Sequence, residues 1–320
     1  IRRPPRSTLS SSSAASDVYK RQTLYFALFS LGIFYGFFSL SRHSFMTQIV
    51  PSEYRGKAFS RFGGINRIGW FFGPVAGGYT AGSLGVDIPF YFISIVSIFT
   101  ALIIFFSREP KYEPSDNSGN NKSRTFKETV AENKKIFAIG GSGHFIMQFL
   151  RQCRHVLIPI WAFSIGLGVE DLGLIQSISA AIDMTLFYPV GLIMDKYGRK
   201  WTSVPSIILL SSGFIFLTYA NSFTGLMIVG LLLGFANGLG SGAMLTLGSD
   251  LSPKNQPGSF LGIWRLFGWS GNSAGGPISG AIAQTVGNTA SALSVSMIGG
   301  IGVIIFSFFL PETLKNRSSL

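Results

Sequence analysis

The sequence predicts an all-α membrane protein in which several helices cross the bilayer. Hydrophobic side chains make up 47% of its 320 residues and charged side chains only 12%, and the mean hydropathy is +0.39. So little polar material cannot cover a soluble fold of this size. The 39 glycines agree with this prediction, because small residues let helix backbones approach closely within lipid.

Nine segments are apolar and long enough to be spanning helices. A span needs roughly 20 mostly apolar residues, because the hydrocarbon layer is about 30 Å thick and a helix rises about 1.5 Å per residue. We place the spans at 24–49, 59–82, 89–107, 136–163, 171–194, 203–220, 223–248, 259–284 and 289–310. Short polar loops join most of them.

The basic residues predict the orientation of these helices. If Pro51–Lys57 lies in the cytoplasm, the loops on that side carry Arg55, Lys57, Arg108, Lys111, Lys122, Arg124, Lys127, Lys134, Lys135, Lys196, Arg199, Lys200, Lys254, Lys315 and Arg317. The opposite loops carry no lysine or arginine, so the positive-inside rule predicts a cytoplasmic C-terminus in a plasma (inner) membrane. The net charge of +12 does not indicate nucleic-acid binding, because these residues are not gathered with aromatics on one soluble face.

Residues 1–22 do not fit this orientation. The segment begins without methionine, is rich in serine, and carries five basic residues on the side that the rule leaves poor in them. It reads like translated sequencing-adapter sequence, and we expect an artefactual or disordered segment there. A genuine transit segment or disordered tail is the alternative.

An internal repeat predicts the domain organisation. Residues 24–110 match residues 224–312 in an ordered series across three helices; Pro51 aligns with Pro253, and Gly73-Pro74 with Gly276-Pro277. Three spans precede the second copy and none precedes the first, so we expect about three further spans upstream and twelve in all. Residues 23–110 would then be half of an N-terminal six-helix bundle, 111–135 a cytoplasmic linker, and 136–320 the C-terminal six-helix bundle with a short cytoplasmic tail.

Three motifs carry a resemblance to a known family. The loop from Gly191 to Lys200 reads GLIMDKYGRK, and it resembles the hallmark cytoplasmic loop of the major facilitator superfamily. The run Gly69-x-x-x-Gly73-Pro74-x-x-Gly77-Gly78 resembles the Gly-Pro motif of exporters and antiporters in that superfamily, with Ser60 where an earlier glycine is usual. A closing Leu310-Pro311-Glu312-Thr313 extends the resemblance over residues 24–315, and the implied fold is a major-facilitator-like bundle with nine of twelve helices present.

The loop is predicted to act as a latch of the cytoplasmic gate. The resemblance implies that Asp195 engages the start of the 59–82 helix near Arg55, Lys57 or Arg61. Gly198 permits a tight turn, and Arg199 and Lys200 are expected at the anionic lipid surface. Lys196 is assigned to the same latch. A loop that only obeys the positive-inside rule is the alternative, with Gly191 merely beginning it.

The Gly-Pro motif predicts a kinked and closely packed helix. Pro74 removes a helix hydrogen bond, and Gly69, Gly73, Gly77 and Gly78 admit close neighbours. Such a helix suits a gate between two halves of a transporter, and a purely structural kink is the alternative.

Ionisable residues within the spans are the candidate pathway residues, because charges at membrane depth are costly unless they face a cavity or a partner. Asp183 is a candidate proton carrier or cation contact, or else a structural ion-pair partner of Arg151 or Arg154. His144, Gln148, Arg151 and His155 share one helical stripe, and Arg265, Trp269 and Asn272 share another. The predicted pathway residues are Asp183, Arg151, Arg154, His155, Arg67 and Arg265, with interhelical hydrogen bonding as the alternative for the histidines.

The sequence thus favours a secondary active transporter that works by alternating access, and we expect it to export drug-like molecules or organic anions. The buried arginines favour an anionic or zwitterionic substrate, whereas the Gly-Pro motif favours export of lipophilic drugs against walls such as Trp161, Phe187, Tyr188, Trp264 and Trp269. We expect proton coupling, a monomer in the lipid bilayer, and no cofactor, metal or catalytic site, because no metal-ligand or nucleotide motif occurs. A uniporter or importer of a small anionic metabolite is the alternative, and a membrane receptor or scaffold is the alternative class.

Overall fold

The computed structural model describes residues 22–38, 41, 45, 55–107, 126–253, 257–310, 312 and 313, with only the backbone at 55–64 and 257. The predictions for residues 1–21, for Lys254, for most of the linker and for the C-terminal tail lie outside these residues. The chain divides into two compact units, one of residues 1–65 with 108–116 and one of residues 66–107 with 117–320. The first unit contributes a described helix over Gln22–Phe38.

The other elements are helices throughout the described part of the chain. They are α2 (Arg55–Leu84), α3 (Ile88–Phe106), α4 (Phe126–Glu132), α5 (Lys134–Ile136), η1 (Phe137–Gly141), α6 (Ser142–Ser164), α7 (Val169–Tyr197), α8 (Lys200–Leu217), α9 (Phe223–Leu239), α10 (Ala243–Leu251), α11 (Pro257–Thr285), α12 (Asn288–Ile304) and η2 (Ile305–Phe309). The elements η1 and η2 are single π-helical stretches that continue α5 into α6 and extend α12. The all-α prediction is therefore confirmed for these residues.

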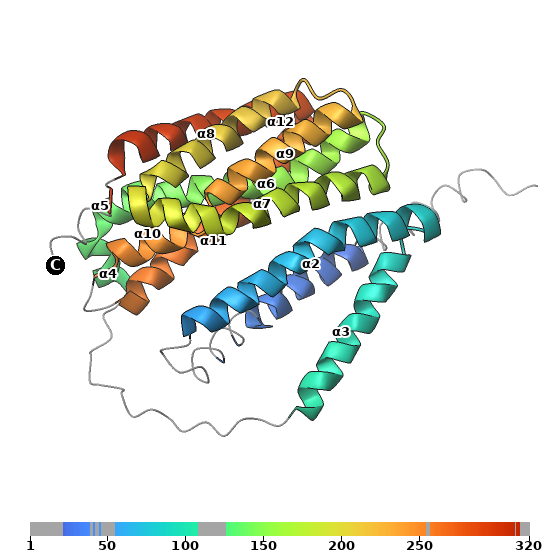
Figure 1. Cartoon of the computed structure of the whole chain (residues 1–320), viewed down its shortest axis with the longest axis horizontal. Coiled ribbons are helices and arrows are strands. Elements are labelled where there is room, and N and C mark those ends of the chain that lie inside the picture. The colour runs from blue at the N-terminus through green and yellow to red at the C-terminus, as the bar shows by residue number, and fades with distance from the viewer. Residues whose placement is uncertain are drawn as a thin grey trace, which may run out of the picture. The chain divides into compact units, whose positions relative to one another are not determined.

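Helices α6 to α12 pack into one bundle with a continuous apolar core (Figure 1). The most extensive pairings join α6 with α11, α7 with α9, and α8 with α12. Small residues lie at these interfaces: a Cβ atom on Gly271 would overlap the carbonyl of Phe145, and one on Gly234 would overlap that of Ser179. Backbones at such close approach are typical of membrane helices.

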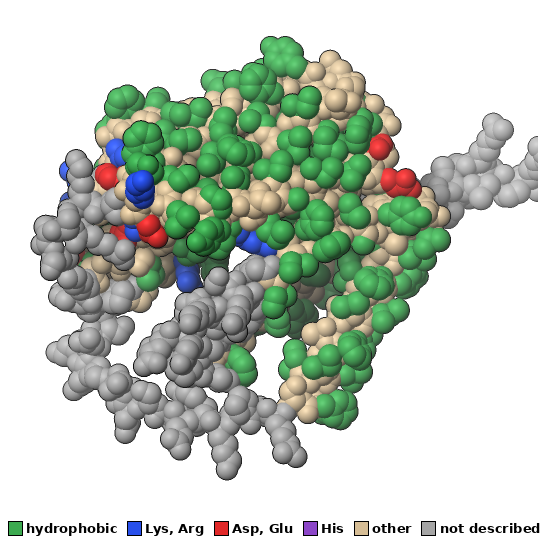
Figure 2. Space-filling view, viewed as in Figure 1, with side chains coloured by type: hydrophobic (Ala, Val, Ile, Leu, Met, Phe, Trp, Pro, Cys, Tyr) green, Lys and Arg blue, Asp and Glu red, His purple; other side chains and the backbone are tan. Residues whose placement is uncertain are grey.

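Five helical segments meet a strict requirement of length and hydropathy for a membrane span. They are Ile88–Phe106, Val169–Tyr197, Lys200–Leu217, Phe223–Leu251 and Asn288–Phe309. Figure 2 shows hydrophobic side chains over much of the visible face of the bundle, with most visible charged side chains near the helix ends. An apolar exterior of this kind suits a helix bundle surrounded by lipid.

Where they are described, the predicted spans agree closely with the helices, with one correction. Most of residues 39–49, in the first predicted span, lies outside the described residues. The span predicted as continuous over 223–248 is divided, because α9 ends at Leu239 and α10 begins at Ala243. Gly242 adopts φ 77°, a left-handed conformation that costs an L residue roughly 1–2 kcal/mol. The intervening Gly240, Ser241 and Gly242 form what we call the 240–242 break.

Candidate functional site

Four charged side chains gather inside the described bundle, and we call them the central cluster: Arg67 of α2, Arg151 and Arg154 of α6, and Asp183 of α7. Asp183 interacts electrostatically with each of the three guanidinium groups. Arg151 and Arg154 are three residues apart and therefore lie on the same side of α6. Asp183 lies where α7 packs closely on α9, since its Cα would be 3.2 Å from a Cβ atom on Gly238. Four of the six predicted pathway residues therefore come together.

Two of the arginines are anchored by polar groups of the other helices. The Nη2 of Arg67 donates to the Ser241 hydroxyl at 2.7 Å, and its guanidinium lies 3.9 Å from the centre of the Phe187 ring. Arg154 is 6% exposed, and its Nη1 donates to the carbonyl of Leu233 at 3.2 Å. A hydrogen bond from a charged donor is stronger than a neutral one, so the Leu233 carbonyl offsets part of the cost of burying the Arg154 charge.

The cluster also contains buried polar atoms that no described residue satisfies. They are Nη1 of Arg67, Nε and Nη2 of Arg151, Nε of Arg154, and Oδ1 of Asp183. Arg151 uses its Nη1 to donate to the Gln148 side chain at 3.1 Å. A buried donor or acceptor without a partner costs about 1–3 kcal/mol, and more when the group is charged, so these atoms are suited to a polar ligand.

The 240–242 break lies against the same arginines. A Cβ atom on Gly240 would lie 2.7 Å from Nη2 of Arg151, and Ser241 accepts the hydrogen bond from Arg67. The first turn of α10 begins just beyond, where backbone N–H groups carry partial positive charge. Discontinuous helices of this kind line the binding sites of many secondary transporters.

The two remaining predicted pathway residues, His155 and Arg265, and His144 of the same helical stripe as His155 lie in different settings. His144 is 6% exposed, its Nδ1 lies 3.1 Å from the Trp264 carbonyl, and the two rings stack at 5.2 Å. This is the interhelical hydrogen bond that the sequence left as the alternative for the histidines. His155 lies 5.7 Å from the Trp70 ring, and Arg265 is exposed on α11, as is Trp269.

A second group of charges, the Arg199 cluster, joins the 191–200 loop to α10 and to the residues after η2. The Nε of Arg199 lies 2.8 Å from the Asp250 carboxylate, and Nη1 donates to the Met194 carbonyl at 2.9 Å. Asp250 also accepts a hydrogen bond from Thr313 at 3.0 Å. The Glu312 carboxylate accepts from the backbone N–H groups of Arg199 at 3.0 Å and Lys200 at 3.1 Å, so it satisfies the N-terminus of α8, where negative charge is favoured.

This arrangement corrects the prediction for the loop. Arg199 was expected at the lipid surface but is 1% exposed, because Asp250 compensates its charge inside the protein. Lys200 also turns inward and donates from Nζ to the Ser307 carbonyl at 3.1 Å. Asp195 is exposed, and the side chains of its predicted partners Arg55, Lys57 and Arg61 lie outside the described residues.

The Gly-Pro motif makes one close contact with the bundle. A Cβ atom on Gly78 would lie 2.7 Å from the Val169 carbonyl and 3.0 Å from the Gly173 Cα, and the Pro74 carbonyl also meets Gly173. No atom lies within 4 Å of such a Cβ on Gly69, Gly73 or Gly77 in the described residues. The prediction of close packing is therefore met at one end of the motif.

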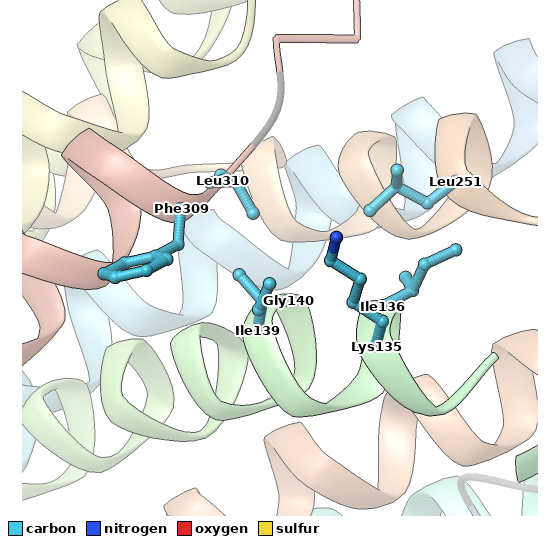
Figure 3. Close-up of a pocket in the computed structure, with 7 residues that line it drawn as sticks. All are labelled: Lys135, Ile136, Ile139, Gly140, Leu251, Phe309 and Leu310. Atoms are coloured by element: carbon cyan, nitrogen blue, oxygen red, sulfur yellow. The ribbon is translucent and has the colours of Figure 1, made fainter.

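An apolar pocket of about 270 Å³ lies near the Arg199 cluster (Figure 3). It is lined by Lys135, Ile136, Ile139, Gly140, Leu251, Phe309 and Leu310. The Lys135 amine extends over the space between Leu251 and Leu310, and it is the one charged group of this lining. The pocket is separate from the residues of the central cluster.

Three residues of these clusters were not assigned from the sequence: Ser241, Asp250 and Glu312. Asp250 and Glu312 had a signal, because each is an acidic residue at the end of an apolar run on the side that carries the basic loops. Ser241 had a weaker one, since it stands between two glycines in the middle of a span.

The comparisons with known proteins agree with the fold. The model of the Major Facilitator Superfamily matches residues 9–150 and 140–320. This chain belongs to the major facilitator superfamily. Members of this superfamily are integral membrane proteins that transport small molecules, so the membrane prediction is confirmed at that level.

Individual superfamily members share modest identity with the chain. "Uncharacterized MFS-type transporter YfkF" of Bacillus subtilis is 25% identical over 67% of the chain and 54% of its own length, so the chain spans about half of that relative. The "Multi-drug resistance efflux pump PmrA homolog" of Lactococcus lactis is 23% identical over 90% of the chain and 72% of that protein. The "Hexuronate transporter" of B. subtilis is 27% identical over 51% of the chain and 38% of that protein.

A solved structure gives the same fold. The crystal structure of a D-xylose–proton symporter matches with a TM-score of 0.57 at 17% identity, over 84% of this chain and 66% of that one. At this identity the likeness concerns the fold, and the function must be argued from the residues.

Proposed function

We propose that the protein to which this chain belongs is a secondary transporter that moves small organic anions across the membrane by alternating access. Residues 136–320 form one six-helix half in this proposal, and residues 23–110 contribute three helices to the other. The protein acts as a monomer in a plasma (inner) membrane, with the C-terminus in the cytoplasm as the distribution of basic residues predicts. It is a carrier and catalyses no chemical conversion.

The central cluster is the observation that carries this proposal. Three guanidinium groups and one carboxylate interact there, and unpartnered donors remain on Arg67, Arg151 and Arg154. Guanidinium groups match carboxylate and phosphate oxygens in geometry and charge. A buried excess of positive charge therefore supports an anionic substrate, and a relative named as a hexuronate transporter handles solutes of this charge.

Asp183 is the proposed proton-carrying group. Without a proton it offsets one arginine charge, and with a proton it leaves the three guanidinium groups to the substrate. The proton and the anion then occupy the carrier together, so an inward proton gradient drives uptake. Replacement of Asp183 by Asn mimics the protonated state and removes the coupling.

The 191–200 loop is the proposed latch of the cytoplasmic gate. When that side is closed, α7, α8 and α10 are held together by Gly191, Asp195, Lys196, Gly198, Arg199 and Lys200. The buried Arg199–Asp250 pair, at 2.8 Å, supports this role. The kink motif at Gly69, Gly73, Pro74, Gly77 and Gly78 acts as the hinge of α2 against α7.

Transport by the complete protein in proteoliposomes tests this function. With an acid-outside pH step, we expect accumulation of labelled lactate or succinate, loss of accumulation in Arg151→Gln, and gradient-independent exchange in Asp183→Asn. Lys127→Gln removes an exposed positive charge on α4 and serves as the control with unchanged rate. Proteoliposomes that accumulate neither anion, while transporting a lipophilic cation such as ethidium, would exclude the proposal.

Efflux of lipophilic drugs is the second candidate. It is supported by the resemblance of the Gly-Pro motif to that of exporters, by the contact of Gly78 with α7, and by a relative named as a multidrug efflux pump. In this mechanism a proton and a cationic drug occupy Asp183 alternately, so the two move in opposite directions. Ethidium efflux from cells that express the complete protein, driven by acid outside, would favour this candidate.

A further inference from the structure

We infer that the central cluster and the 240–242 break together bind a small solute with two negative charges. This inference rests on the proposed function, since it specifies the substrate of the same site. The chemistry it requires is a pair of carboxylates or one doubly ionised phosphate.

The first argument is the charge of the central cluster. Arg67, Arg151 and Arg154 carry three positive charges and Asp183 carries one negative charge, so a formal charge of +2 remains. A residual charge at membrane depth is costly when water is excluded, because its desolvation costs several kcal/mol per ion. With Asp183 ionised, a dianion neutralises the site when the carrier closes around it and a singly charged solute leaves one positive charge. With the proton on Asp183, a dianion leaves one positive charge and a singly charged solute leaves two.

The second argument is the supply of hydrogen-bond donors. Arg154 is 6% exposed and Arg151 has two buried guanidinium nitrogens without a partner, while Arg67 has one. Unpartnered donor nitrogens therefore outnumber the single unpartnered carboxylate oxygen, that of Asp183. The excess of donors over acceptors fits a ligand whose oxygens only accept hydrogen bonds.

The third argument is the position of the break. Nη2 of Arg151 lies against Gly240, and Arg67 is held at Ser241. The N-cap Gly242 provides no side-chain cap for α10. The N–H of Ala243 donates to the Gly240 carbonyl at 3.3 Å, and the next N–H groups of the first turn remain suited to an anion. Arg67 and Arg151 therefore both lie against the 240–242 break, just before the N-terminus of α10.

Thermal unfolding of the complete protein in detergent, titrated with sodium succinate, sodium phosphate or sodium lactate at constant ionic strength, tests this inference. We expect succinate or phosphate to raise the Tm at concentrations about tenfold lower than lactate, in accord with the strength of charged hydrogen bonds. If only succinate acts, the ligand is a dicarboxylate; if only phosphate acts, it is a phosphate. Equal responses to lactate and to both dianions would overturn the inference.

Two substitutions change the charge of the site in opposite directions. Because the preference between ligands is compared within each variant, a general loss of stability does not affect the test. Arg151→Gln lowers the formal charge to +1, so lactate should match or exceed the dianions. Asp183→Asn raises the charge to +3, so the dianions should bind more tightly and citrate should bind for the first time. Lys127→Gln, on exposed α4, should keep the preference of the original protein, and an unchanged preference in all three variants would contradict the inference.

The outcomes separate this inference from the function on which it rests. If lactate is accumulated by proteoliposomes and the dianions have no effect on Tm or transport, the anion transporter stands and the double charge is wrong. If none of the anions is bound or moved, both are wrong.

Discussion

The Nε of Arg199 lies 2.8 Å from the Asp250 carboxylate, and the two side chains are only 2% and 14% exposed. Arg199 follows α7 and Asp250 lies near the C-terminal end of α10, so this ion pair joins two helices that are far apart in sequence. Glu312 adds a third segment by binding the backbone N–H groups at the start of α8. The buried guanidinium therefore links the start of α8 to α7 and α10, and Glu312 attaches the residues after η2 to the same helix start.

Asp250→Asn should lower the stability of the complete protein markedly. Removal of one partner of a buried ion pair leaves an uncompensated charge and typically costs about 3–5 kcal/mol. The measurement is the thermal unfolding midpoint in detergent. Asp195→Asn, at an exposed carboxylate in the last turn of α7, should change the midpoint little. Equal shifts for the two variants would show that the Arg199–Asp250 pair contributes no more than a surface charge.

Gly198→Ala should weaken the Arg199 cluster by straining the backbone next to Arg199. Gly198 has φ 110°, where an L residue is strained, and a Cβ atom there would overlap the Glu312 carboxylate. We expect a lower unfolding midpoint and faster proteolysis after residue 313. Gly191→Ala is the matched control, because no described atom lies within 4 Å of its Cβ position. If Gly191→Ala lowers the unfolding midpoint by the same amount, the 191–200 loop is sensitive to any added side chain.

Gly242→Ala should damage the break between α9 and α10. Its φ of 77° makes alanine unfavourable by about 1–2 kcal/mol, and the strain falls beside the arginines that we propose to bind substrate. Anion accumulation by proteoliposomes should fall, and this loss should be larger than the lower unfolding midpoint alone explains. Gly262→Ala, within α11 and with open space at its Cβ position, should leave both values near those of the original protein.

Gly78→Val should interfere with the contact between α2 and α7. A side chain there meets the Val169 carbonyl and the Gly173 backbone, neither of which can yield without moving a helix. We expect a slower transport cycle with little change in the apparent affinity for the anion, measured as the initial rate over a range of substrate concentrations. Gly77→Val faces open space in the described residues and should retain its rate; if it slows equally, α2 requires small residues for another reason.

Helix positions were predictable because the bilayer imposes a minimum length of apolar sequence. The helices α7, α8 and α11, and α12 taken together with η2, begin and end within a few residues of their predicted spans. The division of the 223–251 segment was not predictable from hydropathy, since Gly240 and Gly242 are also common inside intact membrane helices. A left-handed φ depends on the surrounding contacts as well as on the residue type.

The residues of the candidate site could be predicted from the sequence better than their arrangement could. Arg67, Arg151, Arg154 and Asp183 were selected because charge at membrane depth is costly, and the structure brings them together. The inward position of Arg199 was missed because the positive-inside rule describes which side a loop occupies, and it says nothing about a carboxylate on a distant helix. Asp250 lies 51 residues further along the chain, so their pairing depends on tertiary packing.

The short helix α10 gives the two charged clusters one mechanical linkage. Ser241, which accepts from Arg67, immediately precedes its N-cap, and Asp250, which pairs with Arg199, lies in its last turn. Its nine residues form a helix about 13 Å long, at a rise of about 1.5 Å per residue. A tilt of α10 would move Ser241 relative to Arg67 and Asp250 relative to Arg199. Under the proposed function, substrate binding in the interior of the membrane would then be coupled to closure at the helix ends.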